Sequence, residues 1–182
     1  MIYGKRIYLR EIKAEDINQK YLSWMNNSNV NAFLETRFVN QTLESLKDYW
    51  LRIKKDENSF WFAICTKDDD MHIGNIKIGP VNWIHKKGDL SLFIGDSKKW
   101  GKGYGYDSII LISKWSFKHL KLEKINAGIY ESNAKSIKAF EKAGFKVEGI
   151  LREEVKLNSK RENVLRYGLL KNEYKVDNKV IN

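Results

Sequence analysis

The sequence has 182 residues, of which 42% are hydrophobic and 13% aromatic, and a formal net charge of +10. This length predicts one domain with its own core, and the aromatic content argues against a disordered chain. A single cysteine, Cys65, and three histidines argue against a disulfide framework and a Cys/His zinc cluster, so no metal is predicted. No apolar run approaches the about 18 residues of a membrane helix, and we recognise no secretory signal, so we expect a cytoplasmic protein without membrane contact.

The basic excess is mostly lysine, because the chain has only seven arginines, and the lysines are spread along the sequence. This distribution favours an ordinary solvated surface, and the alternative is a basic face that attracts an anionic ligand. A nucleic-acid-binding protein is a further interpretation of the charge. It would need a basic recognition helix or interleaved arginines and aromatic residues, which the sequence lacks, so no nucleic-acid partner is predicted.

The first third of the chain predicts one strand and two helices. Alternating apolar and polar residues predict a strand over residues 6–11. Asp16 is a candidate N-cap for a short helix that continues through Trp24, and the asparagine-rich residues 26–29 predict a turn. Thr42 predicts the start of a second helix, because a hydroxyl there can cap the first helical N–H groups.

The rest of the chain changes from a strand pattern to an alternation of strands and helices. Period-two patterns predict an antiparallel meander over residues 60–65, 73–78 and 89–94. After a glycine loop, the expected order is a helix over 107–120, a strand over 125–130, a helix over 134–142 closed by Gly144, and strands over 145–157 and 163–170. The fold class predicted is a single α/β domain over residues 1–182, with a mostly antiparallel mixed sheet flanked by helices.

The glycine loop, residues 100–105, is typical of a phosphate-binding site. Gly101, Gly103 and Gly105 alternate directly before the long helix, so the backbone can approach an anion while the helix N-terminus supplies partial positive charge. The spacing does not fit a Walker loop, because Lys102 is followed by glycine, nor a dinucleotide fingerprint, which needs a third glycine further on. The alternative is a turn that needs glycines for its conformation alone.

Several motifs in order along the chain resemble the GNAT acetyltransferases. They are Phe93-Ile94-Gly95-Asp96, the glycine loop, Asn133-x-x-Ser136, Phe140 to Phe145, and Glu148-Gly149-x-Leu151-Arg152. The resemblance extends to Leu9-Arg10 and Trp24-Met25-Asn26, and is strongest to the ribosomal-protein alanine N-acetyltransferases. It implies transfer of an acetyl group from acetyl-CoA to a primary amine.

The resemblance also implies which residues hold acetyl-CoA. The loop backbone would bind the pyrophosphate, the backbone at Phe93 would bind the pantetheine like an added strand, and Asn133 would lie near the thioester. The implied contacts are Phe93, Ile94, Trp100, Gly101, Lys102, Gly103, Tyr104, Gly105, Asn133 and Ser136. Residues 60–182 would form the acetyl-CoA-binding core, and residues 1–59 would supply the acceptor-site helices.

The catalytic candidates are Asp89, Ser136 and Tyr130. Amide formation needs a neutral amine, so a base must take its proton, and Asp89 matches a position where similar proteins carry a carboxylate. Many GNAT enzymes protonate the departing thiolate with a tyrosine, but that position here is Phe140. Ser136 or Tyr130 could replace it, or orientation alone could supply most of the catalysis. The alternative readings are an aspartate at a solvent-facing strand entry, a helix-surface hydroxyl and an ordinary strand tyrosine.

The acceptor is less well defined than the donor. The early segment and the last hairpin offer aromatic and arginine side chains, namely Trp24, Asn26, Arg37, Phe38, Trp83 and Arg161. Such a set suits a nucleotide-linked amino sugar or a peptide N-terminus, whereas a polyamine would demand clustered carboxylates. Trp24 and Trp83 could instead fill the core. A CoA-binding module without catalysis is the remaining alternative, and we expect a monomer or homodimer.

Overall fold

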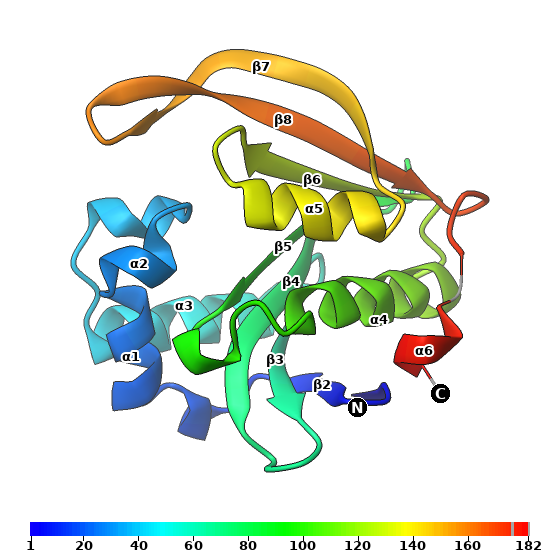
Figure 1. Cartoon of the computed structure of the whole chain (residues 1–182). Coiled ribbons are helices and arrows are strands. Elements are labelled where there is room, and N and C mark those ends of the chain that lie inside the picture. The colour runs from blue at the N-terminus through cyan, green and yellow to red at the C-terminus, as the bar shows by residue number, and fades with distance from the viewer. Residues whose placement is uncertain (176, 182) are drawn as a thin grey trace.

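The computed structural model describes residues 1–175 and 177–181, which form one mixed sheet of eight strands in the order β1-β2-β3-β4-β5-β6-β8-β7 (Figure 1). All neighbouring strands are antiparallel except β5 and β6, which are parallel. The strands are β1 (Ile2–Tyr3), β2 (Ile7–Glu11), β3 (Phe60–Thr66), β4 (His72–Asn82), β5 (Lys87–Ile94), β6 (Lys124–Tyr130), β7 (Lys146–Leu157) and β8 (Lys160–Leu170). The predicted α/β fold with a mostly antiparallel mixed sheet is confirmed.

Helices cover both faces of this sheet. They are α1 (Gln19–Met25), α2 (Ser28–Asn31), α3 (Leu43–Lys55), α4 (Tyr104–His119), α5 (Ala134–Lys142) and α6 (Asn178–Ile181), with single 3-10 turns at Ala14–Asp16, Glu35–Phe38 and Ser97–Lys99. None of the described helices is long and apolar enough to cross a membrane.

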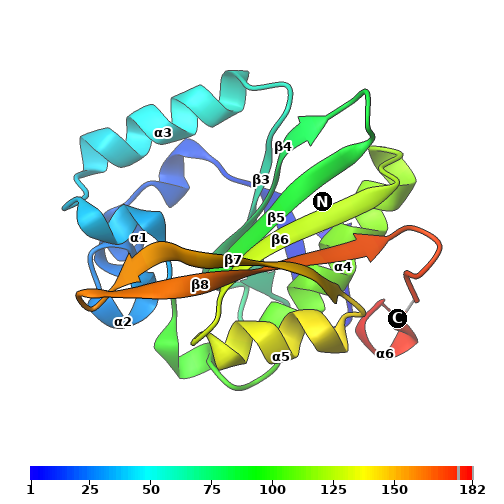
Figure 2. The ribbon, with the colours of Figure 1, turned by 90° about the horizontal axis from the view of Figure 1, so that it is seen from above.

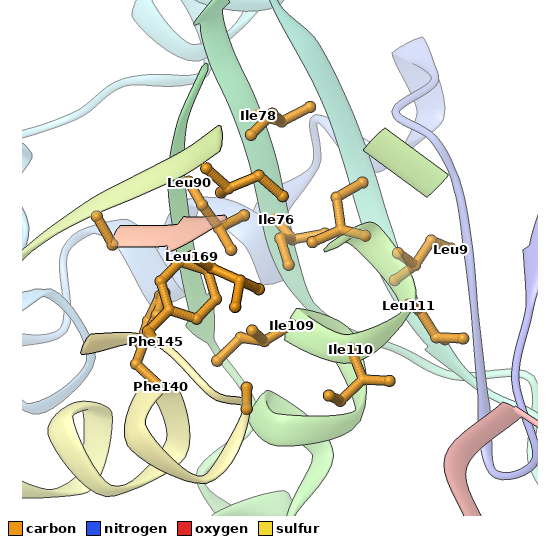
Figure 3. Close-up of a cluster of buried hydrophobic side chains, with 14 of the residues drawn as sticks. Leu9, Ile76, Ile78, Leu90, Ile109, Ile110, Leu111, Phe140, Phe145 and Leu169 are labelled. Carbon is orange, nitrogen blue, oxygen red and sulfur yellow. The ribbon is translucent and has the colours of Figure 1, made fainter. Parts of the chain in front are cut away.

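Two hydrophobic clusters divide the core between the faces. Strand β3 contributes to both because its side chains alternate, with Phe62 and Ile64 on the α4 side and Trp61 and Ala63 on the α1 side. Figure 3 shows the larger cluster, in which side chains of α4 and α5 pack on the sheet. The continuous run of buried residues in β3 follows from this double coverage.

The sheet opens into a fork between β5 and β6. Their ladder consists of three pairs and ends where Asp89 lies beside Asn126. Beyond that point β5 continues to Ile94 along β4, and β6 continues to Tyr130 along β8. The edges of β5 and β6 that would otherwise pair therefore face each other across the fork.

The prediction that Asp16 caps the first helix is wrong. Asp16 closes a 3-10 turn and is buried, and its carboxylate accepts hydrogen bonds from Arg10 at 2.6 and 2.7 Å. Helix α1 begins later, where the side chain of Asn18 accepts a hydrogen bond from the Tyr21 N–H. Residues 26–29 are also not a simple turn, because Asn27 caps the short helix α2.

Other boundaries differ by a few residues. Thr42 caps α3 as expected, and α5 has the predicted limits of residues 134–142. Strand β4 runs past its predicted end at residue 78 through a bulge against β5, which the period-two pattern does not anticipate. Helix α4 begins at Tyr104, three residues early, because Gly103 takes the left-handed N-cap conformation.

Candidate active site

The fork opens between β5 and β6, with a free edge on each strand, near the centre of the molecule (Figure 1), and Figure 2 shows β7 and β8 crossing above these strands. On β5, Leu90 and Leu92 belong to the cluster that packs against α4, whereas Phe93 packs with the aromatic side chains of α1. An extended ligand with amide groups can hydrogen-bond to such an edge as an added strand would. The fork is therefore suited to a narrow, amide-containing chain.

The glycine loop lies at the open end of this fork. The indole Nε1 of Trp100 donates a hydrogen bond to the carbonyl of Ile94 at 2.7 Å, which ties the loop to the end of β5. Gly101 and Gly103 have left-handed φ angles of +73° and +84°, and both are exposed. Because the first N–H groups of a helix have no partner within the helix, α4 presents donors and partial positive charge to an anion here.

An arginine that sequence analysis missed supports the loop from behind. Arg6 donates from Nη1 to the carbonyl of Lys102 at 2.9 Å and from Nε to Asp107 at 2.8 Å. Asp107 lies in the first turn of α4, and its side chain is 4% exposed. Burial raises the pKa of the Asp107 carboxyl, and Arg6 opposes that shift. Arg6 thus joins the loop to the segment before β2.

A second missed arginine lies at the apex of the fork. Arg166 on β8 pairs with Gly128 on β6, and its Nη2 donates to Asp89 Oδ1 on β5 at 3.2 Å. The guanidinium crosses Gly128, where a Cβ atom would come within 3.1 Å of Nη1. Both charged side chains are about half exposed. Asp89 therefore faces the fork with a cation beside it.

Comparisons with known proteins identify the family. Residues 6–146 match the profile described as the acetyltransferase (GNAT) domain. The probable N-acetyltransferase YjcK of Bacillus subtilis is 32% identical over 170 residues, which are 87% of this chain and 90% of the relative. This chain belongs to the GNAT acetyltransferases. It is accordingly an acetyl-CoA-dependent N-acetyltransferase.

Other GNAT relatives carry more specific names. The spermidine N(1)-acetyltransferase of Escherichia coli K12 is 24% identical over 176 residues, covering 95% of this chain and 90% of that protein. The crystal structure of the Vibrio cholerae spermidine N-acetyltransferase, in complex with CoA and spermine, has a TM-score of 0.85 at 24% identity, covering 93% and 98%. The likeness to this crystal structure, at 24% identity, shows a shared fold. Neither of these two relatives is named for the ribosomal-protein branch, so the resemblance to that branch stays a prediction.

The motif Asn133-x-x-Ser136 lies at the start of α5, next to the mouth of the fork. The side chain of Asn133 accepts a hydrogen bond from the Ser136 N–H and so caps α5, while the Ser136 side chain is partly exposed. Phe140 is 2% exposed and its ring centroid lies 4.9 Å from that of Phe145. Phe140 is thus a core residue, as Figure 3 shows.

Tyr130 ends β6 beside the acceptor-side segment. Its hydroxyl donates a hydrogen bond to Glu35, which lies in the 3-10 turn Glu35–Phe38. Burial and this carboxylate raise the pKa of Tyr130, so the phenol stays protonated at neutral pH. Arg37 stacks within 5.2 Å of the Tyr130 ring centroid. The turn therefore packs on the end of β6.

The structure does not bring the six predicted acceptor residues together. Trp24 is buried against Gly95, where a Cβ would lie 2.1 Å from the indole. Trp83 lies in the turn that joins β4 to β5, at the end of β5 away from the fork mouth. Its Nε1 donates a hydrogen bond to Asn58 Oδ1. These two placements correct the expected acceptor site: Trp24 fills the core, where a bulky apolar ring gains most from burial, whereas Trp83 is 46% exposed in the turn before β5.

The other four lie nearer the mouth. Asn26 exchanges two hydrogen bonds with the backbone of Gln41. Arg37 donates to the carbonyls of Leu34 and Lys156 at 2.8 and 2.6 Å, which links the 3-10 turn to β7. Phe38 is exposed, and Arg161 in the last hairpin is exposed and donates to a backbone carbonyl of β7. Most polar atoms of this set therefore have structural partners.

Proposed function

We propose that this enzyme transfers the acetyl group of acetyl-CoA directly to a primary amine, with both substrates bound at the β5–β6 fork. The observation that supports this most is the continuity of the fork and the glycine loop, joined by the bond from Trp100 to Ile94. A ligand with a pyrophosphate at one end and an amide-containing arm at the other matches that arrangement. The division into a core (60–182) and acceptor helices (1–59) stays a prediction, and Arg6, from the first part, contacts the glycine loop.

The residues present suit acetyl-CoA as donor. Donors at the start of α4 would bind the pyrophosphate, and the backbone of Phe93 and Ile94 on the free edge of β5 would bind the pantetheine amides. Bound there, acetyl-CoA supplies a thioester whose carbonyl carbon is open to an amine. Among the described residues, no group of His, Cys, Asp and Glu is arranged to hold a metal ion.

Asp89 is placed to handle the proton of the amine. A primary amine is mostly protonated at neutral pH, and the ammonium form has no lone pair with which to attack. Asp89 would take the proton directly or through water, and Arg166 would hold the carboxylate in place. The nitrogen then forms its bond to the carbonyl carbon as the carbon–sulfur bond breaks. The proton for the departing thiolate would come from Tyr130 or Ser136, and the second proton of the amine nitrogen would restore that acid, while Asp89 releases its proton to water.

The acceptor we propose is a small-molecule amine or a peptide N-terminus. Asp89 at the fork apex and Glu35 at the end of β6 are two carboxylates, each with an arginine beside it, that can accept hydrogen bonds from an amine. A nucleotide-linked amino sugar needs free arginines for its phosphates, and Arg37 already donates to two carbonyls. The relatives named for spermidine make a polyamine part of the small-molecule class.

The test is thiol release from acetyl-CoA across a panel of amines at two salt concentrations. The panel contains spermidine, a peptide with a free N-terminus, an aminoglycoside and a nucleotide-linked amino sugar. We expect one of the first three to stimulate thiol release and to yield the amide. A phosphate-bearing acceptor would instead show a KM that rises with salt and on Arg37→Ala or Arg161→Ala. Tight acetyl-CoA binding with no turnover on any amine would mean a binding module and contradict the proposal.

Replacing Arg166 is expected to lower kcat about tenfold at neutral pH, less than the about 100-fold loss of a general base, because Arg166 only positions Asp89. In Arg166→Gln the carboxylate of Asp89 loses its cation and its anchor, while acetyl-CoA affinity should stay within about twofold. Arg52→Gln, an exposed arginine on α3, is the matched control. Steady-state kinetics check both, and an Arg166→Gln variant with wild-type kcat would remove Arg166 from the site.

Substitution of Tyr130 and of Ser136 distinguishes which of the two protonates the departing thiolate. If Tyr130 protonates the thiolate, Tyr130→Phe should lower kcat by about 100-fold with little change in the KM for acetyl-CoA, while Ser136→Ala changes kcat less than about threefold. The reverse pattern would assign the role to Ser136. Near wild-type kcat in both variants would show that the thiolate needs no acid from this enzyme.

A further inference from the structure

We infer that Arg6 is a positioning residue for acetyl-CoA: it neutralises Asp107 beneath the N-terminus of α4 and anchors the Lys102 carbonyl, so that the glycine loop can accept the pyrophosphate. This inference rests on the proposed position of the cofactor at the loop. Nothing in the GNAT motifs of this chain points to Arg6, which lies directly before β2 and far from the loop in sequence.

The contacts of Arg6 span the whole turn of the loop. Nη1 donates to the Lys102 carbonyl at 2.9 Å, and Nε and Nη2 lie 2.8 and 2.7 Å from Asp107 Oδ2. The guanidinium carbon is 5.1 Å from the ring centroid of Tyr104. A Cβ at Gly103 would come within 3.1 Å of Nη2, so the cation lies directly against the loop backbone. One side chain thus fixes the loop and the first helical turn together.

The buried carboxylate of Asp107 requires a positive charge beside it. A carboxylate in the first turn of a helix stabilises the helix, but it uses the same positive end of the dipole that would attract a phosphate. The Asp107 side chain is 4% exposed, so water screens it poorly. Lys142 and Asp177 are the other charged groups near it, and their effects on Asp107 oppose each other. Arg6 therefore supplies the main compensation for the buried negative charge.

The carbonyl of Lys102 is the second part of the inference. A loop that binds an anion must direct its N–H groups toward the ligand and its carbonyls away from it. The hydrogen bond to Arg6 holds the Lys102 carbonyl on the side of β2. Gly103 follows in a left-handed conformation, which turns the chain into α4. Loss of Arg6 would free this carbonyl to rotate and would leave Asp107 unpaired.

The experiment is a double-mutant cycle on acetyl-CoA affinity, measured by calorimetry. Arg6→Gln should weaken binding by about tenfold or more, while Asp107→Asn should change it by less than about threefold, because asparagine still accepts from Arg6. In the double variant Arg6→Gln/Asp107→Asn the unpaired charge is gone, so binding should be at least about fivefold tighter than in Arg6→Gln. With saturating acetyl-CoA, kcat of Arg6→Gln should match the wild type, since only cofactor binding is affected.

Each other outcome overturns the inference. Wild-type affinity in Arg6→Gln would show that the loop does not need Arg6. A double variant as weak as Arg6→Gln would show that Arg6 binds the phosphate itself or acts independently of Asp107. If Arg6→Gln does not fold, Arg6→Lys takes its place: lysine retains the charge but cannot make all the contacts, and it should bind between about twofold and tenfold more weakly.

A separate variant distinguishes failure of this inference from failure of the proposed cofactor site. Gly103→Val alters the loop itself without removing Arg6. If Gly103→Val weakens binding and Arg6→Gln does not, the inference about Arg6 is wrong and the cofactor site stands. If neither weakens binding, the cofactor is not at the loop. Thermal unfolding of each variant without ligand confirms that affinities are compared between folded proteins.

Discussion

Replacing Gly103 with valine is expected to weaken acetyl-CoA binding by about 100-fold or more while the protein remains folded. Gly103 has a φ of +84°, a left-handed conformation that a β-branched residue adopts only with strain. A loop that relaxes from this conformation moves the N–H groups at the start of α4, and the added Cβ would come within 3.1 Å of Arg6 Nη2 and displace the side chain that anchors the loop. The residue is exposed, so the substitution adds no volume to the core.

Calorimetric titration with acetyl-CoA measures this effect. Gly149→Val is the matched control, because Gly149 lies on β7 and a Cβ there has no heavy atom within 4 Å. We expect the control to bind like the wild type. A folded Gly103→Val protein with wild-type affinity would show that the glycine loop does not bind the cofactor.

Replacing Asp89 with asparagine is expected to lower kcat by about 100-fold at neutral pH, a usual size for the loss of a general base. The amide cannot take a proton from the ammonium form of the acceptor. At high pH the free amine becomes abundant, so the loss should shrink as the pH rises. Arg166 should keep its position, because asparagine still offers an oxygen at the place of Oδ1.

The pH dependence of kcat and of kcat/KM measures this second effect. Asp48→Asn, an exposed aspartate on α3, is the control for removal of a negative charge far from the fork. An Asp89→Asn enzyme whose profile overlays the wild-type profile would remove Asp89 from proton transfer. The amine would then lose its proton to water before it reaches the thioester.

Local sequence patterns were sufficient for the larger elements of the fold. The limits of α5 and the Thr42 cap of α3 depend on side chains within three or four residues, and both were predicted. The predictions were wrong where contacts between distant parts of the chain determine the local structure. Asp16 looked like a helix cap, but pairing with Arg10 holds it in a 3-10 turn. The short strand β1 exists because β2 offers it an edge, which its two residues do not indicate.

The candidate site also has parts that the sequence predicts and parts that it does not. The glycine loop and Asn133 with Ser136 are linear motifs, so a single sequence reveals them. The pairs Arg6 with Asp107 and Asp89 with Arg166 are 101 and 77 residues apart, and they meet only because the strand order brings β2 beside α4 and β8 near β5. Trp24 could not be assigned from sequence, because an aromatic ring suits a core and a ligand wall equally well.

The most direct test of the account is whether the enzyme itself ever carries the acetyl group. The single cysteine, Cys65, is buried on β3 in the cluster beneath α1, away from the fork, and so it is a poor nucleophile for the thioester. The measurement is mass spectrometry of the enzyme mixed with acetyl-CoA alone, combined with initial rates in which both substrates are varied. We predict an unmodified enzyme and intersecting double-reciprocal lines, because the amine attacks in a ternary complex. Parallel lines, with an acetylated enzyme that passes its acetyl group to the amine at the rate of turnover, would contradict the account.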